Sequence, residues 1–215
     1  MTANDTLSQL KEKEREVRRD LIIDAARTLF GARTYDAVSM AEIAKTAGIA
    51  KSSIYTYFPS QEALFVEVVA RDSERCISEM AESIRIGGRE ALSRVIRYFL
   101  DYYFDSEAEW RMITRFALHG HISDTASHRL DLVARRLMDL LEQAITSAAP
   151  SHPEARLLSH TLFSALSGIL ISFRKYPGRS EASRKQHIQR IGDTVERVFL
   201  AYLSTASTPG LSQKY

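Results

Sequence analysis

Apolar residues recur along most of this chain three or four positions apart, which is the spacing of one face of an α-helix. Glycine and proline interrupt the pattern between these stretches, and no convincing period-two alternation marks a strand. We therefore expect an all-α fold of about nine helices. The expected helices cover about residues 12–30, 40–47, 51–57, 61–84, 89–105, 107–118, 125–148, 154–175 and 181–203.

Two of these helices are very short and have clear boundaries. Ser39 and Glu42 have the spacing of a capping box, in which each side chain satisfies a free amide at a helix start. Gly48 can adopt the left-handed conformation that ends the first helix, and Pro59 disfavours helical geometry at the residue after the second. The two helices and the turn between them match a helix-turn-helix unit.

The pattern also predicts how the chain is organised. We expect an N-terminal helix-turn-helix domain over residues 1–60 and a larger helical domain over residues 61–204, linked by the long helix that starts near residue 60. About 60 residues are too few to bury a generous core without help from the rest of the chain. We expect residues 205–215 to be a disordered tail.

The segment KSSIYTYF, residues 51–58, has an unusual surface for a short helix. At helical spacing, only Ile54 and Phe58 share the inner side, while Ser52 and Thr56 point outward. Small polar side chains can reach base edges in the DNA major groove, and flanking lysine and tyrosine side chains can contact phosphates. A short amphipathic helix with a solvated face fits the same pattern equally well.

A family resemblance separates these two interpretations. The stretch SMAEIAKTAGIAKSSIYTYFPSQEAL, residues 39–64, resembles the DNA-binding signature of the TetR-type transcriptional regulators. The shared features are the hydroxyl residue at the start of the second helix, the Ile-Ala-x-x-Ala-Gly run, the Tyr-x-x-Phe ending and the Glu-x-Leu segment. Leu29-Phe30 and Tyr35 extend the similarity, which covers about residues 18–70.

The resemblance assigns DNA-binding roles to individual residues. It implies that Ser39 contacts a phosphate and that Tyr55 and Tyr57 clamp phosphates. The residues that it places in or beside the groove are Lys51, Ser52, Ser53 and Thr56.

Three positions depart from the family pattern. Ala50 stands where Ser or Thr usually caps the recognition helix, which removes a side-chain acceptor of roughly 1 kcal/mol. Tyr57 replaces a frequent histidine, and Gln61 replaces a common phosphate-binding lysine, so one ionic contact is expected to be missing.

The larger domain offers candidate dimer and effector surfaces. Its last two helices, at about residues 154–175 and 181–203, carry apolar stripes and correspond to the helices through which the family usually forms a homodimer. The alternative is that both stripes face the protomer's own core. Aromatic residues gather in the central helices, where the family encloses a small-molecule effector. The predicted ligand-binding residues are Phe99, Tyr103, Trp110 and Phe116, although aromatic stripes more often belong to a core.

Composition and charge neither require nor exclude DNA binding. The 215 residues are 45% hydrophobic and 26% charged with a net charge of +2, so any basic surface must be local. The single cysteine, Cys76, excludes an internal disulfide, fits a reducing compartment and is interpreted as a core thiol. No run approaches the roughly 18 apolar residues of a membrane span, and the N-terminus lacks a signal core, so we expect a cytoplasmic protein.

Catalytic motifs are missing from the sequence. No glutamate has a histidine three residues later, and neither a Gly-x-Ser-x-Gly elbow nor a glycine-rich phosphate loop occurs. We therefore expect neither an enzyme nor a cofactor or metal site. The predicted function is that of a homodimeric repressor released from a palindromic DNA operator by an effector. The alternative is a dimeric helical protein-interaction module that binds no operator.

Overall fold

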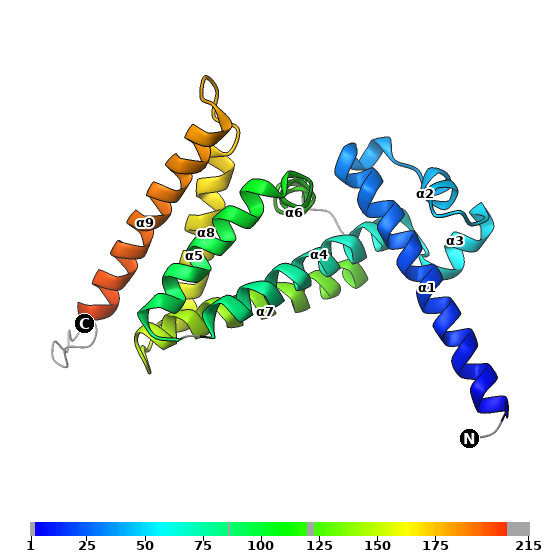
Figure 1. Ribbon diagram of the computed structural model, residues 1–215, viewed down its shortest axis with the longest axis horizontal. Helices are drawn as coiled ribbons and strands as arrows, with labels where there is room; N and C mark the ends of the chain where they lie inside the picture. The colour runs from blue at the N-terminus through cyan, green and yellow to red at the C-terminus, as the bar shows by residue number, and fades with distance from the viewer. Residues whose placement is uncertain (1–2, 86, 120–122, 206–215) are drawn as a thin grey trace. The chain divides into compact units, whose positions relative to one another are not determined.

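The structure, a computed structural model, describes residues 3–85, 87–119 and 123–205. Over these residues it contains nine α-helices and one short 3-10 helix, with no strand, which confirms the all-α prediction (Figure 1). The expected tail lies outside the described residues except for Thr205, the last residue of its helix. The helices are α1 (Ala3–Ala32), η1 (Tyr35–Ala37), α2 (Met40–Thr46), α3 (Lys51–Tyr57), α4 (Gln61–Ile84), α5 (Arg89–Asp105), α6 (Glu107–His119), α7 (Asp124–Ala148), α8 (Ala155–Phe173) and α9 (Glu181–Thr205).

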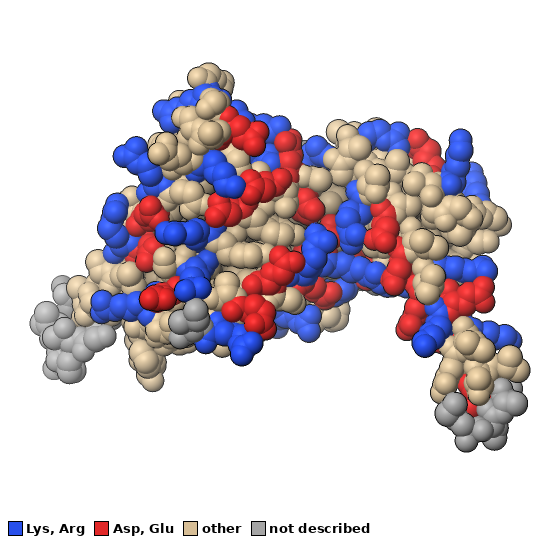
Figure 2. Space-filling model, in the orientation of Figure 1, with Lys and Arg blue, Asp and Glu red and all other residues tan. Residues whose placement is uncertain are grey.

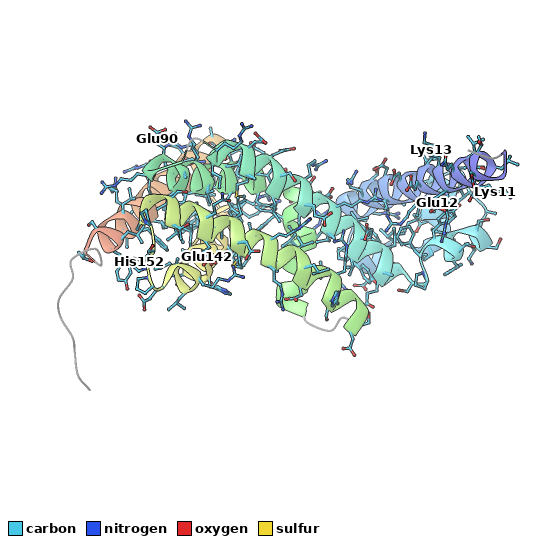
Figure 3. All side chains as sticks on the ribbon, turned by 90° about the horizontal axis from the view of Figure 1, so that it is seen from below. Lys11, Glu12, Lys13, Glu90, Glu142 and His152 are labelled. Carbon is cyan, nitrogen blue, oxygen red and sulfur yellow. The ribbon has the colours of Figure 1, made fainter. Side chains whose placement is uncertain are left out.

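The first helix is longer than predicted, because it begins at Ala3 rather than near residue 12. Residues 5–18 are exposed throughout, so no apolar stripe against a core marks this part in the sequence. Its helical conformation is supported locally, as by the ion pair between Arg18 and Glu14 at 2.6 Å. Lys11, Glu12 and Lys13 project from this free part of α1 into solvent (Figure 3).

The chain forms two compact units. Unit 1 comprises residues 1–72 and 108–131, and unit 2 comprises residues 73–107 and 132–215. The chain therefore passes from one unit to the other within α4, at the start of α6 and within α7, whereas the sequence places the functional division at residue 60. The predicted division separates a DNA-binding segment from an effector-binding one, and it is not a division into compact units. It stays a prediction.

The core of unit 1 is built from α1 to α4 together with α6. Ile22, Phe30 and Ile43 are almost completely buried in it. Phe30 and Phe65 meet edge to face with ring centroids 4.8 Å apart, and Met112 of α6 packs against the same cluster. The segment after residue 107 thus completes a core that the N-terminal residues begin.

A set of ion pairs centred on Glu67 joins three helices of unit 1. Its carboxylate lies 3.0 Å from Arg19 of α1, 3.3 Å from Arg71 of α4 and 3.2 Å from Arg129 of α7. Burial alone would raise the pKa of Glu67, but the hydrogen bonds and charges of Arg19 and Arg129 lower it below its ordinary value. Glu67 is therefore ionised at neutral pH and holds the three helices together.

Unit 2 is built around α5, α8 and α9, which pack on one another (Figure 1). Gly192 allows α9 to approach α5, because a Cβ atom at this position would lie 2.6 Å from a methyl group of Leu100. Arg174 is buried and donates to the carbonyl oxygens of Tyr103 and Phe104 at 3.0 and 2.8 Å. These bonds satisfy carbonyls at the C-terminal end of α5.

Helix α8 corrects one expectation from the sequence. Among the described residues, it is the one helix long and apolar enough to cross a membrane by length and composition, with a window of mean hydropathy 1.3. The expectation rested on an unbroken apolar run, and Ser, Thr and Gly residues interrupt the run in α8. Because these residues are uncharged, the mean hydropathy of the helix remains high. Core helices of water-soluble proteins pass the same test, so α8 is weak evidence for a membrane span.

The single cysteine lies in the core of unit 2, as expected. Cys76 is a free, buried thiol. Burial raises its pKa to about 12, so the thiolate form is scarce at neutral pH and the side chain is chemically quiet.

The Glu67 ion pairs lead to a prediction about stability. Because the pKa of Glu67 is lowered in the folded state, its contribution is present above the ordinary carboxyl pKa and is lost as pH falls through the lowered value. We expect Glu67→Gln to lower the free energy of unfolding by about 1–3 kcal/mol at pH 7 and by less near pH 3.5. Denaturant unfolding followed by circular dichroism at both pH values measures this difference.

Glu82→Gln provides the matched control. Glu82 also lies on α4 and pairs with Arg85 at 3.0 Å, but both side chains are largely exposed. We expect a change of less than about 0.5 kcal/mol for this variant. Equal effects of the two substitutions would contradict a special role for Glu67.

Candidate DNA-binding site

The site is built on two short helices and the turn between them. At the start of α2, the backbone amide of Glu42 donates to Ser39 Oγ at 3.3 Å, and the amide of Ser39 donates to Glu42 Oε2 at 3.0 Å. The predicted capping box is therefore confirmed. Gly48 follows α2 with a φ of 70°, a left-handed conformation that glycine adopts without strain and that turns the chain into α3.

Helix α3 is held in the molecule by the two residues that the sequence predicts. Ile54 is completely buried and Phe58 is 3% exposed, and both belong to the core of unit 1. Arg19 lies over the Phe58 ring, with its guanidinium carbon 5.2 Å from the ring centroid. One side of α3 is thus fixed, and the opposite side is free to meet a partner.

The predicted DNA-binding residues of α3 form this free side. Lys51, Ser52, Tyr55 and Thr56 are exposed, while Ser53 and Tyr57 are partly buried at the edges. Lys51, the first residue of the helix, carries a positive charge, and no acidic residue in the first turn offsets it. The structure therefore brings six of the seven predicted residues together on one helix.

The seventh residue, Ser39, is already engaged by its own helix. Its hydroxyl lies 2.9 Å from Glu42 Oε2, and Arg33 donates to the other oxygen of the same carboxylate at 3.0 Å. The hydrogen bonds from Arg33 and then from Ser39 lower the pKa of Glu42, which stays ionised. A phosphate would therefore have to replace Glu42 as the acceptor of the Ser39 hydroxyl, and this contact stays a prediction.

Two of the three departures from the family pattern, Ala50 and Gln61, have different structural meanings. Ala50 is the N-cap of α3 and supplies no side-chain hydrogen bond, as expected. Gln61 has a structural task, because its side-chain amide donates to the carbonyl oxygen of Tyr35 at 2.8 Å and joins the start of α4 to η1. Local sequence patterns do not predict this bond, because the two residues are 26 positions apart.

Two arginines of α6 contact the N-terminal helices, whereas the sequence favours solvated charges at these positions over partners for an acidic effector. Arg111 donates to the carbonyl oxygens of Phe30, at 3.3 Å, and of Gly31 near the end of α1. Arg115 lies over the Tyr35 ring, 4.4 Å from its centroid, and 3.6 Å from Asp36. Both contacts fall within unit 1 and join α6 to the helix-turn-helix region.

The charges around the site are balanced rather than strongly positive. Tyr57 lines a groove with charged residues of α1 and α4, among them Arg15 and Arg19 but also Glu12 and Glu16. On the face that Figure 2 shows, basic and acidic residues interleave. The surface beside α3 is therefore of mixed charge and does not present a broad positive field to a partner.

The predicted ligand-binding residues are divided between the two units of the chain. Phe99 and Tyr103 lie in the core of unit 2, with ring centroids 4.9 Å apart, and Phe99 also meets Phe163 at 6.1 Å. Trp110 is 9% exposed and belongs to unit 1. Phe116 lies in α6, but its side chain is outside the described residues. A shared pocket for these residues stays a prediction.

This fold and this exposed helix define a helix-turn-helix DNA-binding protein. The sequence profile of the bacterial regulatory proteins of the tetR family matches residues 22–68. An uncharacterised helix-turn-helix transcriptional regulator of Mycobacterium tuberculosis is 30% identical over 188 residues, which are 83% of this chain and 85% of the relative. The chain therefore belongs to the TetR family and is a DNA-binding transcriptional regulator.

Two further proteins show the range of the similarity. The transcriptional repressor KstR of Rhodococcus jostii is 28% identical over 165 residues, covering 75% of this chain and 76% of the repressor. The regulator FadR of Bacillus subtilis, solved in complex with stearoyl-CoA, superposes with a TM-score of 0.64 at 18% identity. The superposition covers 84% of this chain and 97% of FadR, and at this identity it shows a common fold.

The uncapped start of α3 leads to a prediction. Ala50 has the extended backbone of an N-cap, with φ −66° and ψ 141°, so a serine fits there without strain. We expect Ala50→Ser to stabilise the protein by up to about 1 kcal/mol, because its hydroxyl can accept from a free amide of the first turn. Thermal unfolding of the two proteins measures the gain. An unchanged melting temperature would mean that solvent already satisfies these amides.

Proposed function

We propose that this protein is a repressor that binds a palindromic operator as a homodimer and leaves it when a small molecule binds the larger helical domain. The observation that carries the proposal is the polar, exposed side of α3 held against a buried core by Ile54 and Phe58. A helix of this kind can enter the major groove, where Ser52 and Thr56 reach base edges and Lys51 meets a phosphate. Such a protein acts in the cytoplasm, where the DNA is.

A homodimer is proposed because α8 and α9 expose apolar residues in the single chain. Only 28% of the apolar window of α8 is buried. Leu157 and Ile171 of α8 are 61% and 58% exposed, and Val198 of α9 is 62% exposed. A Cβ atom at Gly168, on the same exposed side of α8, would meet nothing within 4 Å. A partner's helices can therefore pack closely against this face.

The apolar stripes that the sequence predicts for dimerisation are Leu158, Leu162, Ala165, Ile169 and Ser172 on the first helix and Ile188, Ile191, Val195, Val198, Phe199 and Tyr202 on the second. Part of them belongs to the core of the single chain. Leu162, Ile169, Ile188 and Phe199 are buried in the protomer's own core. The surface that supports the proposal is the neighbouring stripe of α8 at Leu157, Thr161, Ser164, Gly168 and Ile171, with Val198 and Tyr202 of α9. The spacing of four and three residues keeps the α8 positions on one side of the helix.

Release from the operator requires that the effector and the DNA-binding helix influence each other. Helix α4 starts in unit 1 beside α3 and continues into unit 2, so it offers a continuous connection. In unit 1, Arg111 and Arg115 fasten α6 to the end of α1 and to η1. We propose that an effector favours one tilt of α4 and thereby changes the spacing of the two recognition helices in the dimer.

The DNA-binding proposal predicts a measurable salt dependence. With a labelled duplex from the protein's own upstream region, we expect saturable binding in fluorescence anisotropy at low salt. Lys51→Ala should weaken binding and reduce the slope of log affinity against log salt by about one, because one phosphate contact is lost. Arg85→Ala, which removes an exposed arginine of unit 2, should leave both quantities unchanged.

The same assay separates this function from the alternative of an interaction module. Failure of the folded dimer to bind at low salt, tested across fragments that tile the upstream region, would favour the module. Stearoyl-CoA is the first effector to test, because the FadR structure contains it. Release of the duplex by this compound would support an acyl thioester effector, and unchanged DNA affinity despite binding would contradict the proposed coupling.

The dimer surface leads to a separate prediction. Ile171→Glu places a charge in the proposed interface, so we expect the dimer to dissociate at micromolar concentration. Leu132→Glu is the matched control, because Leu132 is 46% exposed and lies on α7, away from the stripe. Analytical ultracentrifugation measures both masses. A dimeric Ile171→Glu variant would show that another surface joins the protomers.

A further inference from the structure

Unit 1 contains a cavity that is lined by none of the residues predicted to contact DNA or the effector. It has a volume of about 260 Å³ and is bounded by the end of α1, the segment through η1, the start of α4 and the middle of α6. Phe30, Phe65 and Met112 form apolar walls, and all three side chains are at most 3% exposed. Most of the lining is apolar, so water in this cavity finds few polar partners.

The aromatic walls are arranged around one another at fixed angles. Tyr35 meets Phe65 edge to face with centroids 5.0 Å apart and stacks on Phe30 at 5.8 Å. Each ring is held by a different element, namely α1, η1 and α4. A cavity with walls of this kind keeps its shape when empty and suits a compact apolar or aromatic group.

The rim of the cavity adds positive charge to these walls. Arg33 and Arg115 both line it, with side chains 38% and 34% exposed. The partner of Arg115 is Asp36, 3.6 Å away and 79% exposed, which is too far for a good hydrogen bond. Because solvent screens this pair, an anion inside the cavity can compete with Asp36 for the guanidinium.

We propose that this cavity is a second small-molecule site, which binds a compact carboxylate with an aromatic or aliphatic body. The body lies between Phe30, Phe65 and Met112, and the carboxylate accepts hydrogen bonds from Arg115 at the rim, with Arg33 nearby. An inorganic anion does not fit, because it would leave the apolar walls uncovered. The lining of this site shares no residue with the predicted effector-binding set of Phe99, Tyr103, Trp110 and Phe116.

Benzoate is the probe, and the methyl group of Met112 is the reporter. We would label the methionine methyl groups of the full chain with ¹³C and titrate benzoate into the protein without DNA or acyl thioester. The expected result is a saturable shift of the Met112 signal, assigned with Met112→Leu. Met80 and Met138, both buried in unit 2, should not shift. Benzamide, which has the same shape without the charge, should bind at least about tenfold more weakly.

Two variants test the assignment of the residues. Arg115→Met should weaken benzoate binding at least about tenfold, whereas Arg94→Met should not change it. Arg94 is a suitable control, because it pairs with Glu90 at 3.5 Å and is 43% exposed on a helix of unit 2. Thr34→Trp keeps every charge but fills the mouth of the cavity, and its backbone is extended, so it should fold and bind benzoate poorly.

Several results would overturn the proposal. These are an unmoved Met112 signal at millimolar benzoate, a shift confined to Met80 or Met138, equal affinity for benzoate and benzamide, or undiminished binding by Arg115→Met or Thr34→Trp. The experiment contains no DNA, so its failure would leave the proposed repressor function intact. A failure of operator binding would in turn say nothing about the cavity.

Discussion

The exposed face of α3 depends on the burial of two side chains. A helix of seven residues is not stable on its own in water, because the cost of forming its first turn is repaid only over a longer helix. This helix also lacks a side-chain cap at Ala50. Ile54 and Phe58 must therefore supply its stability by packing into the core of unit 1. Substitutions that loosen this core should affect DNA binding even when they leave every polar residue of α3 in place.

Charge imposes a second constraint on the same unit. Its N-terminal 60 residues carry nine Lys and Arg against eight Asp and Glu, and several arginines are already used within the fold. Arg18 pairs with Glu14, and Arg19 pairs with Glu67. Glu67 is largely buried, so Arg19 is committed to the fold, whereas the Arg18–Glu14 pair is exposed and weak. With charges so nearly balanced, long-range electrostatic attraction of this segment to DNA should be modest.

Local features of the sequence predicted most of what they control directly. The capping box at Ser39, the turn at Gly48 and the inward side of α3 follow from residues within four positions of one another, so spacing alone predicts them. The start of α1 was missed for the opposite reason. Residues 5–18 are exposed and pack against no core, so this part of the helix has no buried apolar stripe by which the sequence could predict it.

Contacts between distant residues were beyond the sequence pattern. The bond from Gln61 to Tyr35 and the pairing of Arg33 with Glu42 depend on how the turns fold back on one another. The predicted stripe on α8 also fell partly on the wrong side, because Leu162 and Ile169 face the protomer's own core. Periodicity shows that a helix has an apolar side, but it does not say which of two adjacent sides meets the rest of the chain.

Helix α6 belongs to the same compact unit as the helix-turn-helix region and helps to hold that region together. Arg111 lies 80 residues from Gly31 in sequence, yet its guanidinium satisfies carbonyl groups at the end of α1 that the helix itself leaves free. Met112 fills part of the same core, and Arg115 covers Tyr35. The core begun by the N-terminal helices is thus completed by α6, which comes after residues 73–107 of unit 2 in the chain. A movement of α6 must therefore change the surroundings of α1 and η1, because Arg111 and Arg115 of α6 contact these two elements directly.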